Sequence, residues 1–388
     1  MEPVSPYTAP PLEAAVEHGE VKRSERRHTL LLYGASGILS LLGLILLLVG
    51  LEGKEARSEV SGGDVSFLVL GDWGRRSEYN QSNVAQAMAK KAAASSIRPS
   101  FVISTGDNFY ESGLTSPHDE DFELSFSKVY TMPELQIPFY AVLGNHDYGE
   151  WWYPNSTAAE DAARGPPPVE DCPEQDEKNQ ECYYSPLHQL DIRLKKRDAR
   201  WNCARSYMLG IDDNKIDIFF IDTSPILYTK YYDAPWATNR GGIREQDWLE
   251  QVAELEVNLA KSTAAWKFVV GHHPIHSNHM KTRQFEEMVD VIEPLILKYN
   301  VSAYFCGHDH NLQHIIVPDQ QGYHQILSGA GSQLGKGFFR QKNSPFQHDA
   351  TQGFVMATVM TDVMHVEYLT IDSPVEPLYS VDIPLFII

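Results

Sequence analysis

Five apolar segments of this sequence each run into a glycine and then into a side chain that can bind a metal ion. Short apolar runs that end at a glycine are typical of buried strands. Such side chains, placed at the carboxyl ends of strands, are expected along one edge of a sheet, where open α/β sheets hold their chemistry. The segments and the side chains after them are Val65–Leu70 with Asp72, Phe101–Thr105 with Asp107 and Tyr110, Phe139–Leu143 with Asn145, Phe268–Val270 with His272, and Val301–Cys306 with His308 and His310.

These side chains offer both hard oxygen and imidazole nitrogen. Seven ligands are too many for one tetrahedral zinc ion, and they suit two metal ions about 3.5–4 Å apart with one carboxylate between them. A phenol such as that of Tyr110 ionises only in alkaline water, so a phenolate ligand requires a strongly charged, hard cation, iron(III) above all. An amide oxygen and two imidazoles suit a divalent ion such as Fe, Zn or Mn in the second position.

The segments between the five sites predict the elements that position them. Apolar residues at helical spacing run from Trp248 to Leu259 and from Phe285 to Leu295, which indicates two amphipathic helices packed on a sheet. Two further apolar runs, Phe354–Met360 and His365–Ile371, flank a turn and predict a hairpin. We therefore expect an α/β fold, a two-sheet β-sandwich with helices outside.

The N-terminal region predicts a membrane anchor. Residues 29–51 carry no charge and are rich in leucine, and as a helix they would be about 34 Å long, enough for a hydrocarbon core of about 30 Å. The apolar run is too long for a cleavable signal peptide. Four basic residues, Lys22, Arg23, Arg26 and Arg27, lie just before this run. We therefore expect a cytosolic, disordered tail over 1–28, a linker over 52–64, and a catalytic domain over 65–388 on the lumenal or extracellular side.

Residues 149–204 break the strand–helix alternation and are expected to form an excursion near the active site. In a lumenal domain Cys172 and Cys182 could close a small disulfide loop, or Cys203 could replace one of the two. Three glycosylation sequons fall after the predicted anchor, at Asn80, Asn155 and Asn300. With 32 basic and 52 acidic residues and a formal charge of −20, the chain lacks the basic character of a nucleic-acid surface.

The five blocks GDxG, GDxxY, GNHD, VxGH and GHxH, in this order, resemble the purple acid phosphatases, and most closely their low-molecular-weight, tartrate-resistant-like class within the calcineurin-like metallophosphoesterase superfamily. The resemblance implies the metallophosphoesterase fold and an acid phosphatase that hydrolyses phosphate monoesters by attack of a metal-bound hydroxide. It places Asp72, Asp107, Tyr110 and His310 on iron(III), and Asp107, Asn145, His272 and His308 on the divalent metal, with Asp107 bridging.

The same resemblance implies two histidines that are not ligands. His146 would contact the substrate phosphate, with Asp147 placed to orient its ring. The second would protonate the leaving group, and it corresponds to His279, with His276 as the alternative, because the stretch around it departs from the family pattern. Histidine is largely protonated in acid, as a proton donor must be.

Two other functions remain open from the sequence. One is a calcineurin-like phosphodiesterase with two divalent metals, in which Tyr110 would not be a ligand. The other is a catalytically inactive ectodomain used for binding, although all seven ligands are present. The expected substrates are small phosphomonoesters, with phosphoproteins as a further class, and the expected location is the secretory pathway, a vacuole or lysosome, or the cell surface.

Overall fold

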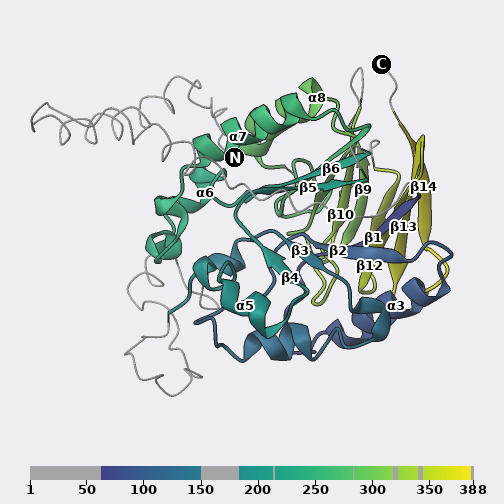
Figure 1. Ribbon diagram of the computed structural model, residues 1–388. Helices are drawn as coiled ribbons and strands as arrows, with labels where there is room; N and C mark the ends of the chain where they lie inside the picture. Colours follow the sequence, from purple (N-terminus) through teal and green to yellow (C-terminus); the bar gives the residue numbers. More distant parts are fainter. Residues whose placement is uncertain are drawn as a thin grey trace, which may run out of the picture. The chain divides into compact units, whose positions relative to one another are not determined.

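The computed structural model describes residues 63–149, 183–212, 215–282, 284–317, 322–339 and 344–385. Two mixed seven-stranded sheets form the centre of this part of the chain (Figure 1). The first sheet has the order β14 (Tyr379–Pro384), β13 (Val363–Thr370), β12 (Gly353–Val359), β1 (Val65–Leu70), β2 (Pro99–Ser104), β3 (Phe139–Ala141) and β4 (Trp201–Cys203). The second has the order β11 (Phe346–His348), β9 (Leu312–Ile316), β10 (His324–Ser328), β8 (Ala303–Cys306), β7 (Trp266–Val270), β6 (Ile216–Phe220) and β5 (Tyr207–Ile211).

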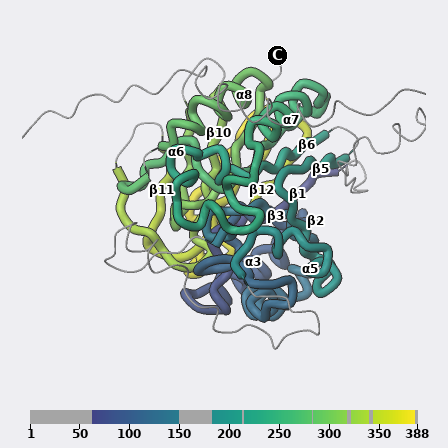
Figure 2. Tube along the Cα trace, turned by 90° about the vertical axis from the view of Figure 1, so that its left-hand side faces the viewer, coloured from purple at the N-terminus to yellow at the C-terminus, as the bar shows by residue number. Residues whose placement is uncertain are grey.

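Helices cover the outer face of each sheet. In both views α7 and α8 lie along the second sheet, while α3 and α5 lie on the side of the first (Figures 1 and 2). The helices are α3 (Gln81–Ala94), α5 (Ile192–Arg197), α6 (Tyr228–Tyr231), α7 (Trp248–Lys261) and α8 (Glu293–Lys298). Single helical turns lie at η1 (Glu123–Ser127), η2 (Pro133–Leu135), η3 (His146–Tyr148), η4 (Pro186–His188), η5 (Pro235–Thr238), η6 (Ile243–Glu245) and η7 (Met288–Ile292).

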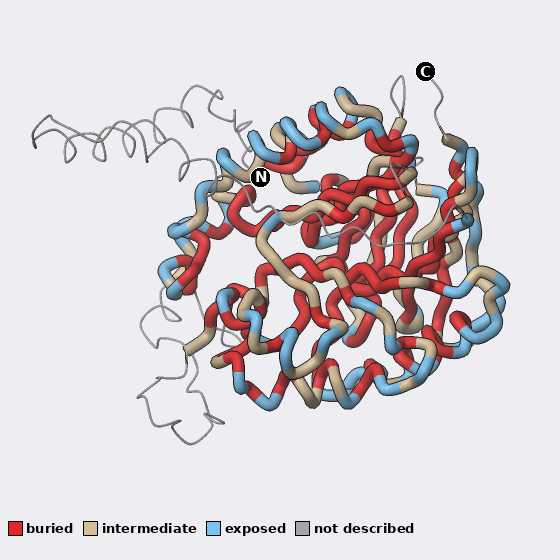
Figure 3. Tube along the Cα trace, in the orientation of Figure 1, coloured by how far each residue is buried: buried red, intermediate tan, exposed pale blue. Residues whose placement is uncertain are grey.

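Strand β1 is apolar except for the buried Ser66, because both of its faces are buried (Figure 3). Phe67 and Val69 point into the core between the two sheets, where the Phe67 ring lies 5.1 Å from Phe101 of β2. Leu68 and Leu70 point the other way and pack with residues of α3. Side chains that alternate between two buried faces explain why this strand shows no polar period.

The predicted sandwich, the helix at α7 and the β12–β13 hairpin are confirmed, the hairpin with Gly353 opposite Thr370. The expectation of one common sheet edge is wrong. Strands β1, β2 and β3 belong to the first sheet, whereas β7 and β8 belong to the second. The five ligand loops therefore meet from two facing sheets, an arrangement that depends on long-range strand pairing and not on the local pattern of each strand.

The C-terminal part of the expected excursion 149–204 also belongs to the fold. Strand β4 pairs in parallel with β3, and the Trp201 side chain is fully buried. Here the sequence pattern misled because β4 has only three residues, too few to show a period. Residues 150–182, with Cys172, Cys182 and Asn155, lie outside the described residues. Within the described part of the chain, Cys203 and Cys306 are free thiols.

The predicted membrane span over residues 29–51 also lies outside the described residues. Among the residues described, none of the helices has the length and apolar character that crossing a membrane requires. Of the remaining sequons, Asn80 is exposed and Asn300 is partly exposed.

Candidate active site

The loops that follow the central strands hold their ligand residues in an uncommon backbone conformation. Asp72, Asp107 and His308 have φ angles of 60°, 51° and 68°. Each of these residues directly follows a glycine at the end of a strand. Residues with a side chain seldom adopt positive φ, and such strain is concentrated at functional sites because the surrounding structure must enforce it. The loops are therefore shaped to aim these three side chains.

Two of the glycines are required by close approach. A Cβ on Gly144 would lie 2.1 Å from Oδ1 of Asp107, and a Cβ on Gly307 would lie 2.5 Å from Oδ2 of Asp72. Both distances are far below van der Waals contact. The motif glycines therefore allow backbone from one loop to lie against a carboxylate from another.

The first group of donors converges on the hydroxyl of Tyr110. Its oxygen lies 2.9 Å from Oδ2 of Asp107, 3.2 Å from Oδ1 of Asp72 and 3.0 Å from Nε2 of His310. Asp72 and Asp107 are buried, and Nε2 of His310 lies 3.5 Å from Oδ1 of Asp72. Ligand atoms from Asp72, Asp107 and His310 come within 4.8 Å of one another, close enough to share one ion.

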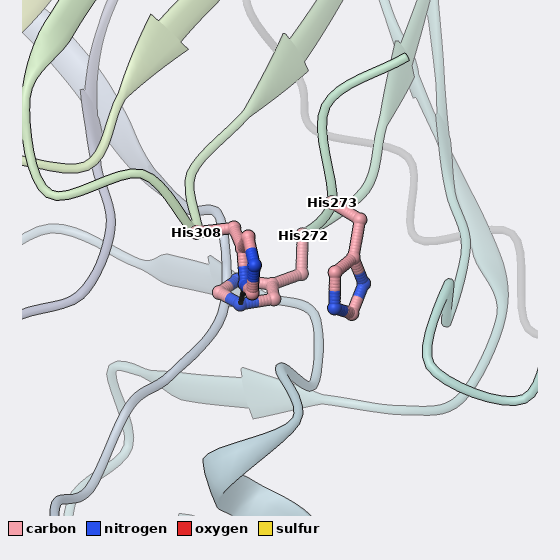
Figure 4. A group of neighbouring side chains, drawn as sticks. All are labelled: His272, His273 and His308. Carbon is pink, nitrogen blue, oxygen red and sulfur yellow. Dashed lines mark hydrogen bonds between the residues drawn. The ribbon is translucent and has the colours of Figure 1, made fainter. Parts of the chain in front are cut away.

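The second group converges on the amide oxygen of Asn145. Its Oδ1 lies 3.1 Å from Nε2 of His272 and 3.0 Å from Nδ1 of His308, and these two nitrogens are 3.2 Å apart (Figure 4). Nε2 of His272 is also 3.4 Å from Oδ2 of Asp107. Asp107 therefore lies between the two groups.

The acidic groups of the first donor set carry opposed pKa shifts. Burial and the charge of Asp107 raise the pKa of Asp72 well above its usual range. For Asp107 burial acts in the same direction, but the charges of His272 and His146 outweigh it and lower the pKa. Burial, together with the charges of Asp107 and Asp72, raises the pKa of the Tyr110 phenol well above its ordinary value.

The histidines differ in the same way. Burial lowers the pKa of His310 to about 4 and that of His308 well below its usual value, so both imidazoles stay neutral. For His272 burial also lowers the pKa, but the charge of Asp107 outweighs it and raises the value to about 9.

This donor chemistry fits a pair of metal cations. The carboxylates of Asp72 and Asp107 and the phenol of Tyr110 are buried within hydrogen-bonding distance of one another. Nearby positive charge would stabilise their ionised forms. The neutral imidazoles of His308 and His310 offer nitrogen lone pairs that are likewise suited to metal coordination. The residues present therefore fit the binuclear centre that the sequence predicts.

His273 lies close to the second group but is occupied elsewhere. The centroid of its ring lies 4.5 Å from that of the His308 ring. Its Nδ1 lies 2.8 Å from Oγ1 of Thr223 and its Nε2 lies 3.0 Å from the hydroxyl of Tyr231. With both ring nitrogens bound to protein groups, His273 packs beside the other two histidines of this group and supports the His308 ring (Figure 4).

Asp147 differs from the expectation. Its carboxylate accepts hydrogen bonds from the backbone amides of Gly144 (2.8 Å) and Asn108 (3.0 Å) and from the side chain of Gln189 (2.6 Å). It thereby ties together the loops after β2 and β3. Nδ1 of His146 instead lies 2.5 Å from the carbonyl oxygen of Glu111, so we assign the orientation of this ring to the Glu111 carbonyl.

The structure distinguishes the two candidates for the proton donor. His279 is 6% exposed, and its Nε2 would lie 3.6 Å from a Cβ on Gly335, a position that is also 3.5 Å from Cβ of His310. This places His279 beside the first ligand group. His276 instead pairs with Glu293 of α8, with Nε2 and Oε1 2.7 Å apart.

Several residues that contact the site were not singled out from the sequence. Gln189 bonds to Asp147, Asp309 pairs with His279, and the Arg75 guanidinium lies 3.7 Å from the centroid of the Tyr110 ring. Asp309 lies inside a motif block and Arg75 lies next to one, so their positions in the sequence could have indicated that they are near the site. Gln189 carried none, because it comes from a distant segment whose placement depends on the tertiary fold.

Comparison with known proteins agrees with this geometry. The family described as Calcineurin-like phosphoesterase matches residues 65–312. Purple acid phosphatase 3 of Arabidopsis thaliana is 37% identical over 79% of this chain and 74% of its own. Purple acid phosphatase 17 of the same plant is 37% identical over 76% of this chain and 78% of its own. Tartrate-resistant acid phosphatase type 5 of Oryctolagus cuniculus is 27% identical over 78% and 86%.

Solved structures share the fold. GAP50, described as the anchor in the inner membrane complex of Plasmodium, superposes with a TM-score of 0.58 at 21% identity, covering 84% of this chain and 90% of its own. The purple acid phosphatase PPD1 from yellow lupin seeds gives a TM-score of 0.54 at 15% identity over 84% and 54%. At these identities the likeness concerns the fold alone. The family match and the 37% identical relatives show that this chain belongs to the purple acid phosphatases of the calcineurin-like phosphoesterase superfamily, and that it is an acid phosphatase.

Proposed function

We propose that the chain is a membrane-anchored acid phosphomonoesterase whose centre holds iron(III) and a divalent metal ion. The observation that supports this most is the position of the Tyr110 hydroxyl, 2.9–3.2 Å from donor atoms of Asp72, Asp107 and His310. A buried phenol among carboxylates suits a trivalent ion better than a divalent one, because only strong positive charge favours the phenolate at acid pH.

The two donor groups then have separate roles. Asp72, Tyr110 and His310 would hold iron(III), Asn145, His272 and His308 would hold a divalent Fe, Zn or Mn ion, and Asp107 would bridge. When bound, such a metal pair supplies Lewis-acid stabilisation and an activated water for an in-line displacement at phosphorus.

Two histidines of the chain would act on the substrate. His146 would hold the phosphate oxygens, with its ring oriented by the Glu111 carbonyl. His279 would donate its ring proton to the departing alkoxide, with Asp309 beside its Nδ1 to hold the ring and stabilise the imidazolium. Protonation matters because an alkoxide is a poor leaving group. The charge on the phosphoryl group itself would already be stabilised by the cations that hold it.

The location and the modifications are further parts of the proposal. An uncharged stretch over residues 29–51, preceded by basic residues, supports a single-pass type II topology with residues 65–388 on the lumenal or extracellular side. On that side Cys172 and Cys182 could pair, and Asn80, Asn155 and Asn300 could carry glycans. The substrates would be small phosphomonoesters and phosphoproteins.

One preparation of the full chain in detergent tests the central claim. We expect about one iron and one further metal ion per chain, a visible absorption band, and hydrolysis of an aryl phosphate monoester in the acid range. A phosphodiesterase with two divalent metals would instead be colourless and prefer a diester. An inactive ectodomain would hydrolyse neither.

A further inference from the structure

A buried arginine lies against the face of the Tyr110 ring. The guanidinium carbon of Arg75 is 3.7 Å from the Tyr110 ring centroid and 5.2 Å from that of Tyr79. Arg75 is 6% exposed, whereas Tyr79 is 51% exposed. A cation over the face of an aromatic ring is attracted by the electrons of the ring, and the attraction is stronger where water is excluded.

The loop that carries Arg75 is held in a costly conformation. Four residues without glycine's freedom have positive φ: Arg76 (49°), Ser77 (74°), Tyr79 (49°) and Asn80 (66°). Oε1 of Gln81 accepts hydrogen bonds from the backbone amides of Arg75 (3.1 Å) and Ser77 (2.9 Å). Such a cluster of strained residues persists only when neighbouring contacts enforce it, and it is typical of functional sites. Here the enforced loop presents Arg75 to Tyr110.

The Arg75 cation is only partly compensated by its neighbours. Its Nη1 pairs with Oε1 of Glu111, but the Glu111 side chain is 64% exposed, so water screens this partner. The Nε of Arg75 is buried and has no hydrogen-bond partner among the described residues. A buried cation with incomplete partners is unfavourable unless another negative group lies close to it. The ring of Tyr110 lies 3.7 Å away, and as a phenolate it would supply such a charge.

We propose that Arg75 is the residue that positions the Tyr110 ring and sets the electronic energy of its phenolate. This inference rests on the proposed iron(III) site and adds to it. Asp72, Asp107 and His310 all approach the hydroxyl end of Tyr110, whereas Arg75 lies on the ring face. The arginine charge therefore lowers the energy of the phenolate electrons more than it lowers the energy of the iron(III) orbitals. Because the gap between the two widens, the phenolate-to-iron(III) charge transfer requires more energy.

Substitutions on the two sides of this ion pair should move the visible band in opposite directions. Arg75→Gln removes the cation, so the band should shift to longer wavelength by about 20 nm, as expected for loss of a unit charge a few ångströms away. The iron reduction potential should fall as well. Arg75→Lys keeps the positive charge, so its band should lie close to that of the wild-type protein. Glu111→Gln leaves the arginine charge unopposed, so the band should shift to shorter wavelength.

Arg76→Gln is the matched control. Arg76 is the next residue and pairs with Asp121, and its side chain is 48% exposed. It should change neither the band nor the potential. Metal content and unfolding temperature are measured for every variant, and if Arg75→Gln loses iron or unfolds, Glu111→Gln and Arg75→Lys decide.

The outcomes separate this inference from the proposed function. A coloured wild-type protein whose band stays in place in both Arg75→Gln and Glu111→Gln overturns the role of Arg75 and leaves the iron site standing. An equal shift in Arg76→Gln would show that any nearby charge has the same effect, and it would also overturn the assignment. A wild-type protein with bound iron but no visible band would refute the Tyr110 ligand, and the inference would fall with it.

Discussion

The carboxylate of Asp309 lies 3.3 Å from Nδ1 of His279. In the sequence, Asp309 stands between His308 and His310, which the proposal assigns as metal ligands. The neighbouring Asp309 carboxylate raises the pKa of His279, although burial acts against it. The GHxH block thus supplies both proposed metal ligands and the group that positions a proton donor. His276 instead pairs with Glu293 of α8, which favours His279 as the proposed donor.

Removal of His279 should therefore depend on the leaving group. His279→Ala should slow hydrolysis of alkyl phosphates by about 10²-fold or more, because the alkoxide then leaves unprotonated. An activated aryl phosphate should be little affected, since its phenolate leaves unaided. The measurement is kcat/KM for both substrates over the acid pH range.

His276→Ala provides the matched control and should leave the ratio of the two substrates unchanged. Equal losses on both substrates in His279→Ala would mean that His279 holds phosphate instead of donating a proton.

Tyr110→Phe should bleach the visible band. The variant lacks the only proposed phenolate, whereas the ring packing, including the contact of 4.7 Å between the Tyr110 and His146 rings, can be retained. The absorption spectrum and the iron content, taken on the same sample, decide the outcome. A variant that keeps both iron and colour would disprove the assignment of Tyr110.

The second donor group should be separable from the first. Asn145→Ala, His272→Ala or His308→Ala should empty the divalent position and remove most of the activity, while iron is partly retained. The reason is that these three side chains converge on one another, and the proposal shares only the Asp107 carboxylate between the two metal ions. Metal analysis checks the prediction, and full occupancy of both ions in all three variants would contradict it.

A pair of buried histidines remote from the ligand set should make the fold less stable in acid. Nε2 of His314 lies 2.9 Å from Nδ1 of His324. Burial lowers the pKa of His314 to about 3 and that of His324 to about 4. The unfolded chain binds these protons at higher pH than the folded chain, so stability present above the unfolded pKa is lost as the pH falls toward the folded values.

Each histidine should contribute up to about 1.4 kcal/mol per pH unit to this loss. Denaturant unfolding at pH 7 and pH 5 measures it, and His314→Gln should reduce the difference between the two pH values. His365→Gln is the control and should leave the difference unchanged, because His365 is partly exposed and paired with Asp382. An unchanged difference in His314→Gln would rule out this source of acid sensitivity.

The membrane topology can be tested without reference to activity. In sealed vesicles prepared from cells that make the full chain, protease added outside should remove the tail 1–28 and leave the catalytic domain intact, because the proposed topology places the N-terminus in the cytosol. Detergent should expose the domain to digestion. Digestion of the domain before detergent is added would show that the orientation is reversed.

The chemistry of the site was readable from the sequence because it is local. Each proposed metal ligand lies in a short motif that begins with a glycine at the end of an apolar strand, and the residue types themselves, such as Tyr110 beside carboxylates, indicate hard cations. The strands β1, β7 and β8, the helix α7 and the β12–β13 hairpin were equally visible, since an apolar run or a helical period is carried by neighbouring residues.

Only the tertiary structure decided what depends on long-range pairing. It divided the five ligand loops between two sheets, placed β4 and Gln189 beside the site, directed Asp147 into the loops, and brought Arg75 onto the ring of Tyr110. The physical reason is that strand order and side-chain direction follow from burying apolar faces between segments far apart in the chain. A local pattern states that a face must be buried, but not against which partner.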